Sequence, residues 1–266
     1  MPTPSSVLSA ASTSGSSPGA RSVPEFLSLE IAQRMAEKLE IVRLQPQKVG
    51  HLGELNLSVL SGLYPEAEHH CFDKRFAANA LSQLFKRITR QQFYKYEAPL
   101  NNGGADFDLI WSNLELHLQG DPNSSMKQWK NKLKPEGLLM FSYLGPDTGK
   151  ELTKLFPNDC LLRNAGSLDM HDVGDGLMQA GFSEPVMDME YLTLSYEDPH
   201  LLCKEAFNLG LLTSPDSAQH LIGAKSNLTI TLEVVYGHAW SPVASRSQNK
   251  TGIATISPDQ IVRPKK

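Results

Sequence analysis

Residues 107–118 read FDLIWSNLELHL, and the first seven of them decide the fold class. This short run is almost wholly apolar and ends in two polar residues, Ser112 and Asn113. A strand inside a parallel sheet is covered on both faces, so its sequence is nearly continuous in apolar residues instead of alternating. The pattern therefore predicts a buried parallel strand whose carboxyl end carries Ser112 and Asn113.

The sequence on both sides of this strand alternates between strand-like and helix-like segments. Further strands are expected at residues 47–53, 67–73, 92–98, 135–145, 184–196 and 227–240. Helices are expected at residues 24–42, 57–65, 75–88, 124–134, 146–156, 169–182 and 199–212, with Asp147 and Asp172 as N-caps. Such alternation is typical of an α/β fold in which crossover helices cover a mostly parallel sheet. One folded domain over residues 24–240 accounts for all of these segments.

Composition narrows the class of protein. A net charge of −4 and a pI near 6.1 argue against a nucleic-acid-binding protein, which usually needs a basic face. The sequence contains no apolar run of about 18 residues, so we expect no membrane span. Its three cysteines are odd in number and far apart, which argues against a disulfide framework and favours the cytoplasm.

The two ends differ from the middle in composition. Residues 1–23 are rich in Ser, Thr, Ala, Pro and Gly, and we expect a disordered N-terminal tail. A transit peptide is the other interpretation, although Arg21 is the only arginine in the segment. Residues 241–266 are again polar and are expected to form a flexible C-terminal tail.

Three groups of residues follow strands at the edge where open parallel sheets bind ligands. They are the loop after Val49, Asp73, and the pair Ser112 and Asn113. An acid in the position of Asp73 can accept hydrogen bonds from both ribose hydroxyls of a nucleoside. The same acid could cap the helix that follows it, and the order of residues does not separate these two roles.

Three phrases carry a family resemblance: FDLIWSNLELHL at 107–118, KLKPEGLLMFSYLGPDTGKEL at 132–152, and DMHDVGDGLMQAGFSEPVMDMEYLTLSYED at 169–198. From about Glu25 to Trp240 the chain resembles class I S-adenosylmethionine-dependent methyltransferases. It is most similar to the BioC type, the malonyl-acyl-carrier-protein O-methyltransferase of biotin synthesis. The resemblance implies a Rossmann-like, seven-stranded, mostly parallel sheet with an antiparallel last strand. It also implies S-adenosylmethionine as the methyl donor.

The resemblance assigns donor-binding roles to Gly50, His51, Gly53, Asp73 and Glu97. Gly53 matches the first glycine of the family's donor-binding loop, and His51 stands where the family has an acid. Asp73 matches the acid that binds ribose, and Glu97 matches the acid near adenine.

At the carboxyl end of the strand over 107–113, the same resemblance implies that Ser112 and Asn113 line the methyl-transfer site as catalytic residues.

The donor-binding loop departs from the family because Leu55 and Leu57 replace its second and third glycines. A left-handed leucine costs roughly 1–2 kcal/mol, and its side chain can collide with a ligand. In one hypothesis the loop takes another path and the donor still binds. In the other the protein is an inactive methyltransferase-like protein that acts through partners. The second hypothesis has Leu55, Val59 and Leu63 on the buried face of a helix that begins early.

Lysines at 127, 130 and 134 predict a basic face that could steer an acidic acyl carrier protein. The alternative for Lys127, Lys130 and Lys134 is an ordinary solvated helix face. No metal site is predicted, because neighbouring strand residues such as His69 and His70 point to opposite faces.

Overall fold

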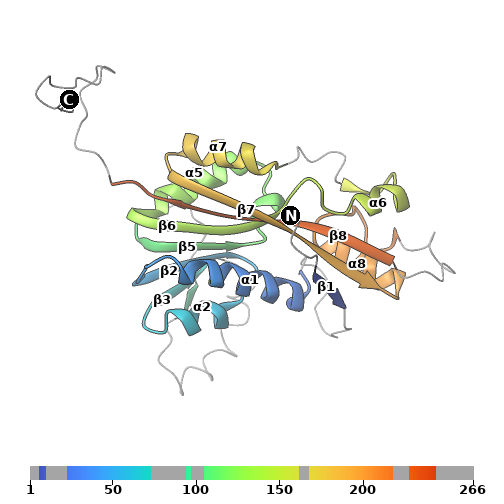
Figure 1. Cartoon of the computed structure of the whole chain (residues 1–266), viewed down its shortest axis with the longest axis horizontal. Helices are drawn as coiled ribbons and strands as arrows, with labels where there is room; N and C mark the ends of the chain where they lie inside the picture. The colour runs from blue at the N-terminus through green and yellow to red at the C-terminus, as the bar shows by residue number, and fades with distance from the viewer. Residues whose placement is uncertain are drawn as a thin grey trace, which may run out of the picture.

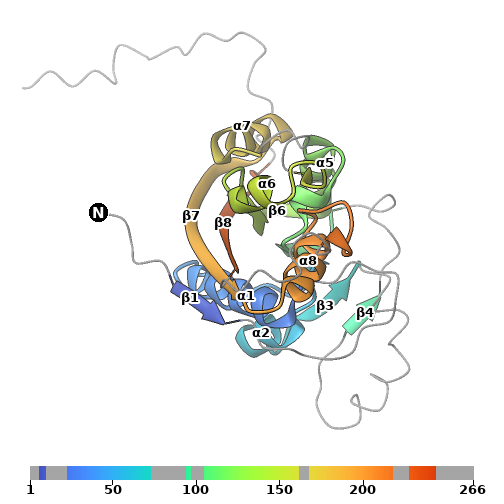
Figure 2. The same cartoon turned by 90° about the vertical axis from the view of Figure 1, so that its right-hand side faces the viewer.

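In the computed structural model, the described residues are 6–9, 23–72, 94–96, 105–161, 168–217 and 228–243, with only the backbone described for 6–9 and 94–96. They form one sheet with helices on both faces (Figures 1 and 2). None of the helices within these ranges is long and apolar enough to cross a membrane.

The strands are β1 Ser6–Ser9, β2 Lys48–Gly53, β3 Glu68–Cys71, β4 Tyr94–Tyr96, β5 Phe107–Asn113, β6 Leu133–Leu144, β7 Ser183–Tyr196 and β8 Leu228–Trp240. They lie in the order β1-β7-β8-β6-β5-β2-β3-β4. Only β8 runs antiparallel to its neighbours β6 and β7, so the mostly parallel α/β sheet with an antiparallel last strand is confirmed.

The resemblance implied seven strands, whereas the sheet has eight. Residues 6–9 form β1, which pairs in parallel with residues 192–195 at the open edge of β7. This strand lies inside the segment 1–23 that we expected to be a disordered tail. Composition did not reveal it because the pairing depends on the free backbone groups of a distant edge strand.

The helices are α1 Glu25–Glu40, α2 Leu57–Leu63, α5 Pro122–Lys132, α6 Lys150–Leu155, α7 Met170–Ala180 and α8 Pro199–Asn208, with a short 3₁₀ helix at Leu116–Leu118. α1 packs against one face of the central strands, whereas α5 and α7 lie side by side on the other face (Figure 1). α6 packs against β8 and α8 packs against β7, in the halves of these strands that lie away from α5 and α7 (Figures 1 and 2).

Two expected N-caps are wrong. The N-cap of α7 is Asp169, whose carboxylate accepts the His171 amide, while Asp172 lies in the first turn. α6 begins after Gly149, which adopts a left-handed conformation, and Asp147 lies in the preceding turn. Helix α7 ends at Gly181, whose φ of 93° gives the left-handed stop that glycine favours.

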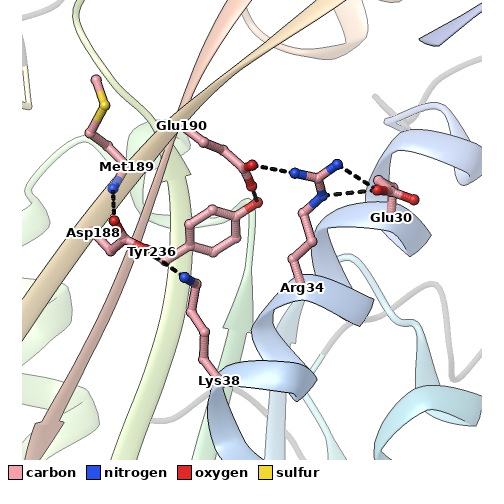
Figure 3. A network of polar contacts seen from close by, with 7 residues as sticks. All are labelled: Glu30, Arg34, Lys38, Asp188, Met189, Glu190 and Tyr236. Atoms are coloured by element: carbon pink, nitrogen blue, oxygen red, sulfur yellow. Dashed lines mark hydrogen bonds and ion pairs between the residues drawn. The ribbon is translucent and has the colours of Figure 1, made fainter. Parts of the chain in front are cut away.

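Helix α1 is tied to the antiparallel strands by a charged network (Figure 3). Arg34 pairs with Glu190 of β7, and Lys38 pairs with Asp188 of the same strand at 2.5 Å. The Tyr236 hydroxyl of β8 donates to Glu190 at 2.5 Å. These contacts hold α1 on the sheet, and the N-terminal part of the same helix reaches the carboxyl end of β5.

Candidate functional site

The chain turns sharply at the carboxyl end of β2, and Gly53 is the residue that allows the turn. Its φ is +72°, and a Cβ at this position would lie 2.1 Å from the Asn113 carbonyl oxygen. The Glu54 amide donates to that same carbonyl at 2.9 Å. Only glycine fits such a left-handed turn with a backbone atom so close. The glycine turn of the predicted loop is therefore present, with its backbone bonded to β5.

Asn113 joins three parts of the site. Its amide nitrogen donates to the Ser28 carbonyl of α1 at 2.9 Å and to Asn56 Oδ1 at 2.8 Å. Its amide oxygen accepts the Ser142 hydroxyl of β6 at 2.9 Å. An asparagine has two N–H donors, so both are engaged here. The buried side chain of Asn113 thus holds α1, the turn after β2 and β6 together.

Leu55 and Leu57 are half-buried and stand outside the buried core. Helix α2 begins at Leu57, so Leu55 belongs to the turn and the hypothesis of a helix that begins early is wrong. The face that α2 presents to the core consists of Val59, Leu60 and Leu63. The replaced glycines therefore do not extend the helix into the turn.

His51, at the position of the family's acid, is directed toward β3. Its Nε2 lies 2.8 Å from Nδ1 of His69, and both side chains are buried. Burial lowers the pKa of His51 well below its ordinary value, and the neighbouring His69 and His70 lower it further. Burial also lowers the pKa of His69. The pair is thus neutral near pH 7 and offers no negative charge to a ligand.

The remaining predicted donor residues occupy different places. Gly50 lies inside β2, where a Cβ would stand 3.1 Å from Phe72 and 3.3 Å from Phe107, so its role in the fold is close packing. Asp73 and Glu97 lie outside the described residues. The preceding Phe72 amide donates to the His51 carbonyl at 3.1 Å, which brings the end of β3 beside the end of β2.

Ser112 and Tyr143 occupy the last positions of β5 and β6 that face α5 and α7. Both side chains are fully buried, and no residue in the described part of the chain hydrogen-bonds either hydroxyl. Ser112 was predicted from its place at a strand end. Tyr143 was missed, because a tyrosine within the run LLMFSYL is indistinguishable in sequence from an ordinary core residue.

A turn after β6 encloses the carboxylate of Glu233, a β8 residue that the sequence did not suggest. The Asp147 amide donates to Glu233 Oε2 at 2.6 Å. A Cβ on Gly145 would lie 2.6 Å from the same carboxyl group, so the turn approaches it closely. Burial raises the pKa of Glu233. The carboxyl ends of β5 and β6 thus combine two hydroxyls that have no partner among the described residues with an acid on β8, the strand next to β6.

Two solved structures share this architecture. The YcgJ protein of Bacillus subtilis is 12% identical, covers 82% of this chain and 100% of its own, and superposes with a TM-score of 0.55. Phosphoethanolamine N-methyltransferase 2 of Haemonchus contortus is 13% identical and superposes with a TM-score of 0.51. The match covers 82% of this chain and 53% of the Haemonchus chain. The strand order, the antiparallel β8 and the Gly53 turn define the class I methyltransferase fold.

Relatives with closer sequences identify the family. A malonyl-[acyl-carrier protein] O-methyltransferase of Gallionella capsiferriformans is 34% identical, with 86% of this chain and 88% of the relative covered. The protein of the same name in Methylovorus is 33% identical, and the match covers 82% of this chain and 83% of the relative. No protein-family model matches the chain. The chain belongs to the malonyl-[acyl-carrier protein] O-methyltransferase family, which confirms the predicted resemblance.

Proposed function

We propose that this chain transfers a methyl group from S-adenosylmethionine to the free carboxylate of a malonyl thioester on an acyl carrier protein, as in biotin synthesis. The relatives' names supply the acceptor. The observation that carries the proposal is the Gly53 turn, which keeps its left-handed glycine and its bond to Asn113. The sulfonium of S-adenosylmethionine presents an activated methyl group to the acceptor oxygen.

The chain's own residues would bind and position the two substrates. The backbone at Gly53 would face the methionine part of the donor, as the family resemblance implies, and its missing Cβ makes room for the Asn113 carbonyl that holds the turn. Asp73 would accept the ribose hydroxyls, and Glu97 would lie near adenine. Asn113 would act as a positioning residue, because both of its N–H donors hold other parts of the site. Rate enhancement then comes from orientation and the exclusion of water.

We further propose that Lys127 and Lys130 steer the acidic carrier protein. Lys127 is exposed on α5, and Lys130 is half-buried on the same helix. Lys134 instead pairs with Asp108 at 2.8 Å, and Asp108 also accepts the Gln47 and Lys48 amides. We therefore assign Lys134 to the attachment of β6 to its neighbour β5, whose Asp108 also holds the start of β2. The cytoplasm remains the proposed location.

Calorimetric titration with S-adenosylhomocysteine tests donor binding. We expect a dissociation constant of about 50 µM or tighter. Asp73→Ala should weaken binding at least about tenfold, because two hydrogen bonds to a charged acceptor are lost. Asp175→Ala removes an exposed acid of α7 and is the matched control. Unchanged affinity in Asp73→Ala would contradict the ribose assignment.

A cofactor-free protein that acts through partners is the second candidate function. The neutral, buried pair His51–His69 favours it, because this pair replaces an acid of the family. Absence of heat at millimolar S-adenosylhomocysteine would support this candidate. Mass spectrometry can follow the methylation of malonyl carrier protein as a gain of one methyl group. Methylation by the purified chain would exclude the cofactor-free function.

A further inference from the structure

Ser112, Phe141 and Tyr143 lie on the same face of the sheet. Ser112 is the register partner of Phe141 across the β5–β6 ladder, and Tyr143 stands two residues beyond Phe141 on β6. Residues two apart on a strand share a face. The rings of Phe141 and Tyr143 stack with centroids 6.1 Å apart and an interplanar angle of 9°. The tyrosine ring is therefore held by packing, and its hydroxyl has a set position.

The surroundings of the two hydroxyls are largely apolar. Leu52 of β2 is the register partner of Ser112, and Val235 of β8 is that of Tyr143. Buried hydroxyls in proteins are nearly always hydrogen-bonded, and neither of these two has a partner within the described ranges. Two buried hydroxyls without a described partner, set among apolar side chains, are polar groups that a small-molecule oxygen could satisfy.

The charges around Tyr143 select the kind of group that it can bind. Burial raises the pKa of the Tyr143 hydroxyl, and Asp169, Glu233 and Asp172 raise it further. The hydroxyl therefore stays protonated near pH 7 and acts as a hydrogen-bond donor. The same three acids disfavour the binding of a further carboxylate at this position. A neutral carbonyl oxygen satisfies the donor without charge repulsion.

We infer that the Tyr143 hydroxyl donates a hydrogen bond to the thioester carbonyl of the acyl acceptor, and that Ser112 contributes a second hydroxyl to the same face of the sheet. This inference rests on the proposed function, because it names the part of that acceptor which the site recognises. The bond holds the acyl group by its neutral end and leaves its carboxylate free for methyl transfer. Tyr143 thereby determines specificity for thioesters.

Two carrier-protein probes and one variant test the inference by calorimetry with saturating S-adenosylhomocysteine. The first probe is malonyl carrier protein. The second is its carboxyethyl thioether, in which a methylene replaces the thioester carbonyl. We expect the wild type to bind the thioester about five- to tenfold more tightly than the thioether. Tyr143→Phe, which keeps the ring stacked on Phe141, should bind both probes equally.

The control variant is Tyr191→Phe, which removes a more exposed tyrosine hydroxyl that donates to Asp147. It should keep the wild-type preference for the thioester. If Tyr143→Phe keeps that preference while it retains the wild-type melting temperature, the inference is wrong. If the wild type binds neither probe, the proposed function fails at the acceptor and the inference fails with it.

Discussion

The turn after β2 and the β5–β6 face around Tyr143 lie at the same edge of the sheet but differ in how their polar groups are satisfied. Around Gly53, the polar groups of Asn113 and Ser142 are bonded to one another and to α1. Around Tyr143, two equally buried hydroxyls have no partner in the described residues.

This difference indicates that the two regions have different roles, one in stability and the other in ligand binding. A bonded network holds a backbone shape before any ligand arrives, so its residues contribute chiefly to stability. An unpartnered buried hydroxyl gains a hydrogen bond only when another group arrives, so its residue contributes chiefly to binding. Substitutions around Gly53 should therefore lower stability strongly, whereas substitutions of the two hydroxyl residues should change it little.

The largest effect is expected at the turn. Gly53→Ala places a Cβ within 2.1 Å of a carbonyl oxygen in a left-handed conformation, which should lower the free energy of unfolding by about 3–5 kcal/mol. Gly62→Ala is the matched control, because nothing lies within 4 Å of its Cβ in α2. It should stabilise the protein by about 0.5–1 kcal/mol. Urea unfolding measures the free energy of unfolding of both variants. Equal values would refute the special requirement for glycine at position 53.

Asn113→Ala should have the next largest effect. It leaves the Ser28 carbonyl, the Asn56 side chain and the Ser142 hydroxyl without their partner, which should cost about 2–3 kcal/mol. Urea unfolding gives this loss, with exposed Gln128→Ala of α5 as the control. A loss below about 0.5 kcal/mol would show that the network does not hold the turn.

Lowering the pH should reduce the free energy of unfolding, because His51 and His69 are buried in their neutral form. Burial lowers the pKa values of His51 and His69, so the unfolded chain takes up protons first as the pH falls below about 6.5. Their contribution to stability is full above this pH and is lost as the pH falls below it, by about 1 kcal/mol for the strongly shifted His51 between pH 6.5 and 5.5. Unfolding measured at these pH values should show a shallower slope for His51→Asn. An unchanged slope would contradict the burial of a neutral pair.

The smallest effect is expected at Ser112. Its hydroxyl has no described partner, so Ser112→Ala should change the free energy of unfolding by no more than about 0.5 kcal/mol. Ser142→Ala, equally buried on the next strand, loses bonds to Leu114 and Asn113 and should cost about 1–2 kcal/mol. Thermal unfolding of this pair of variants is a direct comparison of the two regions.

Much of the fold could be predicted from local patterns. The apolar run 107–111, the position of Gly53 and the stop at Gly181 each follow from a short-range requirement of the backbone. The N-cap of α7 could not be assigned reliably, because Asp169 and Asp172 both lie near the start of this helix. The start of α6 was missed because its N-cap, Gly149, has no side chain that marks the position. The strand β1 could not be predicted at all, since it depends on an edge more than 180 residues away in sequence.

By itself, the sequence determined the fold class and the edge of the sheet where Ser112 and Asn113 lie, because strand and turn requirements act over a few residues. Its similarity to relatives determined the family. Only the tertiary structure decided that the amide group of Asn113 is fully hydrogen-bonded, while the hydroxyls of Ser112 and Tyr143 have no partner among the residues that the structure describes. The reason is physical: whether a buried polar group is satisfied depends on atoms brought from distant segments. Neighbours along the chain do not reveal it.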